Sequence, residues 1–501
     1  MKALVIAEKP SVARDIARVL KCGKKINGAI EGERYIVTWG LGHLVTLADP
    51  EDYDKKYKEW KIDVLPMKPA PFKLEVIKQT GKQFAAVKTQ IHRKDVNEII
   101  IATDAGREGE LVARLILEKA GSKKPIKRLW ISSVTDKAIR EGFAKLKNGH
   151  EYDALYDAAM CRAEADWLVG INATRALTCK YNAQLSCGRV QTPTLAMIAK
   201  REEKIRSFIP EGYYGMTAKE QNIMLTWQDQ KSKSYRSFDK EKMTGLMKKL
   251  DGQKAVVEEI KKTPKKTYAP LLYDLTELQR EANQRFGYSA KETLNIMQRL
   301  YENHKVLTYP RTDSRYLSKD IVPTIKDRLE ACGTGPYRKL AMTAKKKDLS
   351  GKLAFVNDAK VSDHHAIIPT EQFVDLSHMT NEERKIYDLV VRRFLAVLYP
   401  PFEYEQTQVT VKVSGETFLA SGKIVKAQGW RAAYEEEVYS AEDEEEEEAY
   451  ESGKSLKGQT LPELEKGQEI KGLVLSLTEG KTKPPAHFNE ATLLSAMENP
   501  T

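Results

Sequence analysis

The stretch KALVIAEKPS, residues 2–11, joins a short apolar strand directly to the start of a helix. Six mostly aliphatic residues come first, and Pro10 suits the first turn of a helix because that position needs no backbone N–H. Glu8 and Lys9 lie between the two elements, at the carboxyl end of the strand. Ligands of α/β proteins bind at such strand ends. The stretch therefore predicts an amino-terminal α/β domain with a functional edge.

A second unit of the same kind is EIIIATDAGREGE, residues 98–110. Asp104 follows its apolar strand, and Glu108 lies where the next helix begins. Together with Glu8 they would offer three carboxylates, the hard oxygen ligands that Mg²⁺ prefers. The helix dipole also favours acids in a first turn, which accounts for Glu108 but not for Glu8 or Asp104.

The stretch LTYPRTDS, residues 307–314, places a tyrosine next to an arginine across a proline. Pro310 moves Tyr309 out of the helical region, and in an extended segment Tyr309 and Arg311 project to the same side. A phenol can attack a phosphodiester while a guanidinium holds the phosphate. Such a pattern on its own is more simply an exposed strand end, so its meaning depends on the rest of the chain.

Composition narrows the class of protein. A chain of 501 residues is too long for a single core and should form several domains. No apolar run approaches the roughly 20 residues that span a bilayer. Five cysteines without a C-x-x-C pair argue against a zinc ribbon and for a reducing compartment.

The charge is unevenly distributed along the chain. The net charge is +11, but eleven acids lie between residues 435 and 451, and without them it would be +22. Such an excess favours a polyanionic partner, although charge alone does not separate DNA from RNA or a membrane surface. The acidic run itself is most simply a solvated loop.

Taken together, these motifs resemble a known family. Residues 7–11 (AEKPS) and 103–110 (TDAGREGE) resemble a Toprim domain, and residues 309–314 (YPRTDS) resemble the active-site signature of type IA DNA topoisomerases. Further segments follow in the family's order: SCGRVQTPT at 186–194, MQRLYE at 297–302 and DHHAIIPT at 363–370. The AEKPS opening is more similar to topoisomerase III than to topoisomerase I, and the resemblance extends over nearly the whole chain.

The resemblance implies a multidomain α/β and α+β fold in a toroidal arrangement linked by hinges. We expect a Toprim α/β domain at 1–148, a helical domain at 149–212 plus 483–501, a β-rich hinge domain at 213–267 plus 403–482, and a domain at 268–402 that carries Tyr309. The basic stretch 261–270 is predicted to be a linker. Because the last helix leads into further helices in the family, we expect a truncation at the carboxyl end.

The resemblance also implies the activity. Tyr309 would cleave single-stranded DNA through a 5′-phosphotyrosine link without ATP, so that strand passage relaxes negative supercoils and separates catenated DNA before rejoining. Glu8 would protonate the leaving oxygen, and Lys9 and Arg311 would stabilise the phosphate charge. Glu8, Asp104 and Glu108 would hold Mg²⁺. The expected DNA-binding residues are Arg162, Arg189, Gln191, Gln298, Thr308, Asp313, His364 and His365. The protein would act as a cytoplasmic, nucleoid-associated monomer with no membrane contact.

One position departs from the family pattern. Gly106 stands where the D-x-D-x-E-G motif has its second aspartate, which leaves the number of metal ions open. A Toprim nuclease or primase that uses the carboxylates alone is the main alternative. Primases of this kind usually carry zinc cysteines, and a nuclease has no use for Tyr309. A non-catalytic single-strand binder with a vestigial site is a third reading, supported only by Gly106.

Overall fold

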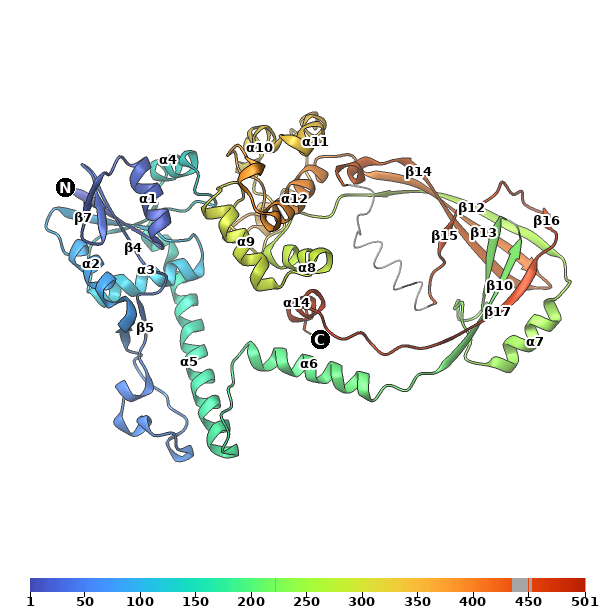
Figure 1. Cartoon of the computed structure of the whole chain (residues 1–501), viewed down its shortest axis with the longest axis horizontal. Helices are drawn as coiled ribbons and strands as arrows, with labels where there is room; N and C mark the ends of the chain where they lie inside the picture. Colours follow the sequence, from blue (N-terminus) through green and yellow to red (C-terminus); the bar gives the residue numbers. More distant parts are fainter. Residues whose placement is uncertain (221, 435–448, 450–452, 501) are drawn as a thin grey trace.

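The computed structural model describes residues 1–220, 222–434, 449 and 453–500. Their ribbon traces a ring around an open centre, with an α/β region at one end and a long β-sheet at the other (Figure 1). Apart from Ala449, the acidic run at 435–451 lies outside the described residues. None of the described helices combines the length and the apolar character that a membrane crossing requires.

The amino-terminal region, residues 1–148, is built on a seven-stranded sheet with the order β2-β3-β4-β1-β7-β8-β9. Its central strand β1 runs parallel to both β4 and β7. The strands are β1 (Lys2–Ala7), β2 (Lys24–Ile26), β3 (Ala29–Glu31), β4 (Tyr35–Trp39), β7 (Val96–Ala102), β8 (Ile126–Arg128) and β9 (Lys147–Asn148). A separate pair is formed by β5 (Val45–Leu47) and β6 (Leu74–Val76).

Helices cover both faces of this sheet. Successive residues of β1 point to opposite faces, and because they are apolar on both faces, both must be covered. Val5 packs with Ile16 of helix α1 (Pro10–Val19), near Ile139 of α4 (Asp136–Ala144). Ile6 packs on the other side, in the core cluster that holds α2 (Gly81–Ile91), α3 (Arg107–Ala120) and Ala159 of α5 (Asp153–Tyr181). Helices α1 and α5 therefore lie on opposite faces of the sheet.

Helix α5 leaves the amino-terminal region and is followed by α6 (Gln191–Arg206), which leads toward the second sheet (Figure 1). Near the carboxyl end, α14 (Glu490–Glu498) returns beside α6, where Arg201 donates to the Ala486 carbonyl at 2.9 Å. The helical character predicted for residues 152–180 is thus confirmed.

The second sheet has eight strands in the order β16-β12-β13-β14-β11-β10-β17, with β15 beside β14. They are β10 (Gly212–Glu220), β11 (Ile223–Gln228), β12 (Ala255–Thr267), β13 (Phe402–Val413), β14 (Glu416–Ala427), β15 (Gly458–Gln459), β16 (Glu469–Ile470) and β17 (Val474–Lys481), and α7 (Lys240–Leu250) accompanies them. Segments from before residue 268 and after residue 401 therefore share one sheet.

The basic stretch predicted as a linker is a strand instead. Lys261–Thr267 continues β12 and pairs residue by residue with β13. Pro264 is tolerated there because β16 reaches only Ala255 and Val256, so the other edge of β12 needs no N–H at Pro264.

The tyrosine region, residues 268–402, is inserted between β12 and β13. It contains α8 (Leu275–Phe286), α9 (Ala290–Glu302), α10 (Ile325–Cys332), α11 (Arg338–Ala344) and α12 (Asn381–Ala396) around one core cluster. An isolated bridge pairs Leu307 with Pro369, so the segments LTYPRTDS and DHHAIIPT lie side by side. The four-domain division itself stays a prediction.

Candidate active site

Two acids meet at the carboxyl end of the amino-terminal sheet. Strands β1 and β7 are adjacent and parallel, and Ala7 pairs with Ala102, so the residues that follow them are neighbours. A carboxylate oxygen of Glu8 accepts a hydrogen bond from the Asp104 backbone N–H at 3.1 Å. Burial, and next the charge of Glu8, raise the pKa of Asp104 to about 7. The pair therefore binds a proton far more readily than two separate carboxyls would.

The loop that carries Asp104 is held from beneath by a buried arginine. Arg128 is fully buried and donates to the carbonyl oxygens of Thr103 and Asp104, at 2.8 and 2.7 Å, and to Glu110 at 2.9 Å. Gly109 allows α3 to approach this loop, since a Cβ there would collide with the Asp104 carbonyl. Glu110 is thereby committed to Arg128 and Arg114 and is not available to a metal.

The tyrosine region brings Tyr309 against this edge. The Tyr309 N–H donates to the Ser132 carbonyl at 2.9 Å, which ties the two regions together. The ring packs edge-on against Tyr301 at 5.5 Å and lies 4.4 Å from the His364 ring, and the residue is only 6% exposed. Burial raises the pKa of Tyr309 well above its usual value, as do the charges of Asp104 and Glu8, while Arg311 lowers it.

His364 is enclosed by the amino-terminal region. Its Nδ1 lies 2.9 Å from the Ser132 hydroxyl, its Nε2 contacts the Ala105 carbonyl, and the Trp130 ring stacks on it at 6.1 Å. Burial lowers the pKa of His364 to about 3, so the imidazole is neutral at physiological pH. Sequence reasoning missed Trp130 and Ser132, which carry no motif signal of their own.

A further acid reaches the site from helix α9. Lys9 forms an ion pair with Glu302 at 2.6 Å, and the Gln298 side chain donates to the same carboxylate oxygen. Lys9 and Gln298 were predicted as site residues, but Glu302 received no role. Its spacing of four residues from Gln298, on one helix face, is the signal that could have found it.

Glu108 lies apart from the other two predicted metal ligands. It pairs with Arg162 at 3.2 Å, and its pKa is lowered, chiefly by a hydrogen bond with His43. Across the described part of the chain, no three His, Cys, Asp or Glu side chains are grouped to hold a metal ion. The structure thus joins Glu8 and Asp104 and leaves Glu108 with Arg162.

The Glu8–Asp104 pair fits a Mg²⁺ ion that keeps water ligands and shares phosphate oxygens with a substrate. Mg²⁺ is commonly bound by one or two carboxylates in this way. Mutual repulsion, visible in the raised pKa of Asp104, would be relieved by a divalent cation. The fit therefore rests on two carboxylates rather than on the predicted three.

The predicted DNA-binding residues fall into two groups. Arg162 and Arg189 lie on the surface and are joined through Asp166, which accepts from Arg189 at 2.6 Å. Gln191 and Asp313 are also exposed, and Gln298 is half-buried. Among these, Asp313 accepts from the Ser362 hydroxyl at 2.8 Å.

Thr308 and His365 are buried, as is His364, and their role as DNA contacts stays a prediction. The Thr308 hydroxyl accepts from the Ile368 N–H at 3.0 Å. The His365 ring bonds the Ala366 carbonyl at 2.7 Å, and burial lowers its pKa to about 4. The pairing of the two segments turns these side chains into the core, where they support the site without reaching its surface.

Comparisons with known proteins agree with this geometry. A family model described as DNA topoisomerase matches residues 150–500, and one described as Toprim domain matches residues 3–134. The chain is 62% identical over 500 residues to DNA topoisomerase 3 of Bacillus subtilis and 63% identical over 501 residues to DNA topoisomerase 3 of Bacillus cereus. In both cases the match covers 100% of this chain and 67% of the relative.

The fold also matches a solved structure. Full-length topoisomerase I from Thermotoga maritima superposes with a TM-score of 0.71 at 24% identity, over 99% of this chain and 75% of that one. At this identity the likeness supports the fold alone. The family models and the Bacillus relatives decide the assignment: the chain belongs to the type IA DNA topoisomerases, in the topoisomerase III group.

Proposed function

We propose that this protein cleaves and rejoins single-stranded DNA through Tyr309, without ATP, and passes another strand through the break. One observation carries the proposal. Tyr309, from the inserted tyrosine region, is enclosed against Glu8 and Asp104, from the amino-terminal region, so the proposed nucleophile and the acids lie on opposite sides of one interface.

Cleavage requires a proton to move from the phenol to the leaving oxygen. The Tyr309 oxygen attacks phosphorus, the bond from phosphorus to the 3′ oxygen breaks, and a 5′-phosphotyrosine forms. Because the pKa of Asp104 is raised to about 7, its carboxylate can accept the phenol proton, and the same proton is then delivered to the 3′ oxygen through the adjacent Glu8. Rejoining reverses these steps, and the phosphotyrosine bond conserves the energy of the broken one.

Positive charge near the phosphate comes from two side chains. Arg311 is exposed beside Tyr309 and lowers its pKa, so its field already favours a developing phenolate. Lys9 would exchange Glu302 for a phosphate oxygen when DNA enters. Glu8 and Asp104 would hold Mg²⁺, which supplies further positive charge at the phosphate.

Strand passage requires the tyrosine region to move away from the amino-terminal region. The contacts between them are non-covalent: Lys305 pairs with Asp15 at 2.7 Å, and the Thr135 hydroxyl donates to Glu371 at 2.6 Å. A single partly exposed pair of this kind contributes little to stability, so breaking it costs little free energy when DNA opens the interface. We call this interface the gate.

The remaining features follow from the same proposal. The four predicted domains would act as the bodies of the opening ring. The substrates would be single-stranded segments of negatively supercoiled or catenated DNA. The enzyme would work as a monomer, associated with the nucleoid in the cytoplasm.

Replacement of Tyr309 by Phe tests the proposal. Tyr309→Phe should abolish the covalent protein–DNA adduct and ATP-free plasmid relaxation, while single-strand binding stays close to wild type, because affinity comes mainly from phosphate and stacking contacts. Tyr301→Phe is the matched control, since Tyr301 is buried against the same ring.

The same assay separates the alternatives. Nicked plasmid without topoisomers would indicate a Toprim nuclease, and unchanged plasmid a binding protein. An adduct that survives in Tyr309→Phe would show that another residue is the nucleophile.

A further inference from the structure

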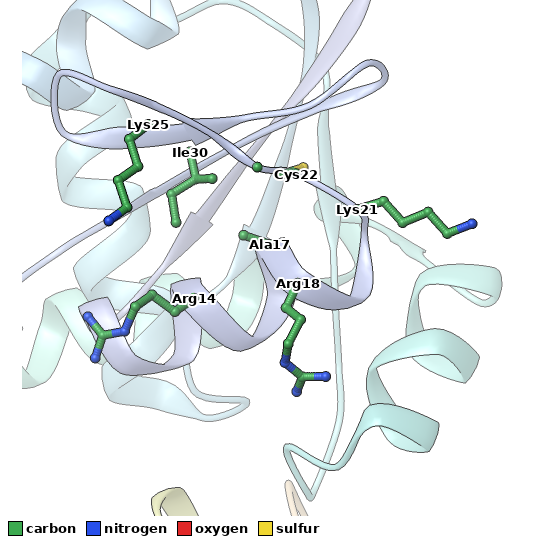
Figure 2. A pocket seen from close by; sticks show the side chains of 8 residues that line it. Arg14, Ala17, Arg18, Lys21, Cys22, Lys25 and Ile30 are labelled. Atoms are coloured by element: carbon green, nitrogen blue, oxygen red, sulfur yellow. The ribbon is translucent and has the colours of Figure 1, made fainter.

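Helix α1 carries a basic face that the mechanism does not use. Arg14 and Arg18 lie one helical turn apart on α1, Lys21 follows in the turn after the helix, and Lys25 lies on the hairpin formed by β2 and β3. They line an open pocket of about 420 Å³ whose eight lining residues include no acid. Figure 2 shows the Arg14 and Lys25 side chains extending to one side of the view and Lys21 to the other, with Ile30 and Ala17 between the hairpin and the helix.

Most of this positive charge is not neutralised within the protein. Arg18 binds Asp136 through two hydrogen bonds of 2.7 Å. In contrast, Arg14, Lys21 and Lys25 have no ion pair among the described residues, and all three are exposed. Three free cations around a pocket complement a ligand with repeated negative charges.

The position of this face relative to the active site suggests which ligand that is. Helix α1 begins directly after Glu8 and Lys9 and runs about 15 Å from them, given its ten residues. It covers one face of the amino-terminal sheet, whereas α5, with Arg162, lies on the other. A strand laid across the carboxyl edge of the sheet at Glu8 would therefore meet α5 on one side and α1 on the other.

The basic face also borders the gate. Asp15, the neighbour of Arg14 on α1, pairs with Lys305 of the tyrosine region, and Asp136, the partner of Arg18, begins α4. A strand that leaves the gate on this side would run alongside α1.

We propose that Arg14, Lys21 and Lys25 form a second backbone-binding surface for the DNA strand, on the side of the scissile phosphate opposite to α5 and α6. This surface rests on the proposed function, because it presumes a strand held at Tyr309. It would contact phosphates rather than bases, since its polar groups are cations without an acceptor.

The test uses a variant with Arg14→Gln, Lys21→Gln and Lys25→Gln. The control removes three exposed cations from the same region, by Lys78→Gln, Lys82→Gln and Lys88→Gln. Binding is measured in the Tyr309→Phe background, so that the result does not depend on cleavage. One series of oligonucleotides is lengthened on the 5′ side of a mapped cleavage site and the other on the 3′ side.

Lengthening the oligonucleotide should increase the affinity of the wild type in both series. The α1 variant should lose this increase in one series only, and the control variant should keep it in both. Three phosphate contacts on a single strand contribute about 2 to the slope of log affinity against log salt, so between 50 and 200 mM salt the wild type should lose about 20-fold more affinity for the extended strand than the variant does. Equal losses in both series, or none, would overturn the proposal.

Two further measurements distinguish DNA binding at this surface from protein docking and from a failure of the proposed cleavage activity. If the α1 variant keeps both DNA series but loses binding of an acidic peptide such as polyglutamate, the face docks a protein and the proposal is wrong. Adduct formation by the protein with Tyr309 intact is measured separately, and its absence would refute the proposed function while leaving the binding result to stand.

Discussion

Gly106 is the residue at which this chain departs from its family motif, and its surroundings leave room for a side chain. Its backbone is fully extended, with φ of 177° and ψ of 176°, a conformation open to any residue. A Cβ at this position would meet no atom within 4 Å. The missing carboxylate is therefore a matter of sequence and not of backbone strain.

Restoring the acid should strengthen metal binding. The unmodified protein is expected to bind Mg²⁺ weakly without DNA, since two carboxylates do not complete a site. Gly106→Asp should tighten binding by about tenfold or more, because Mg²⁺ affinity follows the number and charge of its ligands. Isothermal titration would measure this, with Gly106→Asn as the uncharged control. Equal tightening by Asn, or tight binding by the unmodified protein, would contradict the two-carboxylate site.

His364 makes closure of the gate dependent on pH. Its pKa is lowered to about 3 by burial, whereas an imidazole in water titrates near 6.5. Between these values an opened gate binds a proton that the closed gate does not. The stabilisation of the closed gate is therefore complete above about pH 6.5 and is lost progressively as the pH falls below it.

His364 should raise the open fraction as the pH is lowered from 7.5 to 5.5, whereas Asp104, whose pKa is raised to about 7 by burial, favours closure over the same range, so the difference between wild type and His364→Asn isolates the imidazole. Fluorescence energy transfer between one label in residues 1–148 and one in 268–402 would measure the open fraction. The protein is measured without DNA, so that DNA binding does not affect the result. His364→Asn should remove the opening that acid causes and leave the opposite trend from Asp104, since asparagine does not titrate. An unchanged pH dependence in that variant would assign the effect to other groups.

At the scale of elements, the loop between β7 and α3 depends on one buried ion pair. Arg128 and Glu110 are both fully buried and form an ion pair. Arg128 also donates to the Thr103 carbonyl, and Glu110 also accepts from Arg114. Removing one partner of such a pair leaves a buried, uncompensated charge, which costs far more than the intact pair contributes.

Glu110→Ala should therefore destabilise this element by about 3–5 kcal/mol. Hydrogen exchange of the amides in β7 and α3 would measure the local loss. Glu118→Ala on the same helix is the control, because Glu118 is exposed and only accepts from the Tyr156 hydroxyl. Similar losses in both variants would show that the buried pair has no special role.

At the scale of the whole molecule, the ring is closed at a second place besides the gate. Helix α14 lies between α6 and the turn that joins α8 to α9 (Figure 1). Glu490 accepts from the Ala290 N–H at the start of α9, and Asn283 accepts from the Ala491 N–H at the start of α14. The start of α9 is thus satisfied by a side chain of α14, and the start of α14 by a side chain of α8, so both bonds must break if the tyrosine region moves away from α14.

Glu490→Ala should weaken this contact by about 1 kcal/mol, as expected for a lost helix-start bond, and so raise the open population about fivefold. The same energy-transfer pair would report the change at pH 7.5. Glu498→Ala, at the exposed end of α14, should not raise it, because Glu498 makes no hydrogen bond across the interface in the described structure. Equal opening in both variants would argue against the contact at residue 490.

Much of the candidate site could be predicted from local sequence. The strand-to-helix units at Glu8 and Asp104 and the extended segment at Tyr309 follow from periodicity and proline chemistry, which act over a few residues. The basic stretch 261–267 was misjudged as a linker, because its pairing with β13 depends on residues about 140 positions away. The same limit applies to Thr308 and His365, whose burial is set by the pairing of their two segments.

The sequence by itself determined the α/β class of the amino terminus and the family, and it proposed the candidate tyrosine and carboxylate residues, since these reside in short contiguous motifs. Only the tertiary structure decided which ion pairs form: Glu108 with Arg162, Glu302 with Lys9, and Glu110 with Arg128. Each of these choices is a competition between charged partners distant in the chain. Such a competition is settled by which groups the packed elements bring within hydrogen-bonding distance, and no local pattern contains that information.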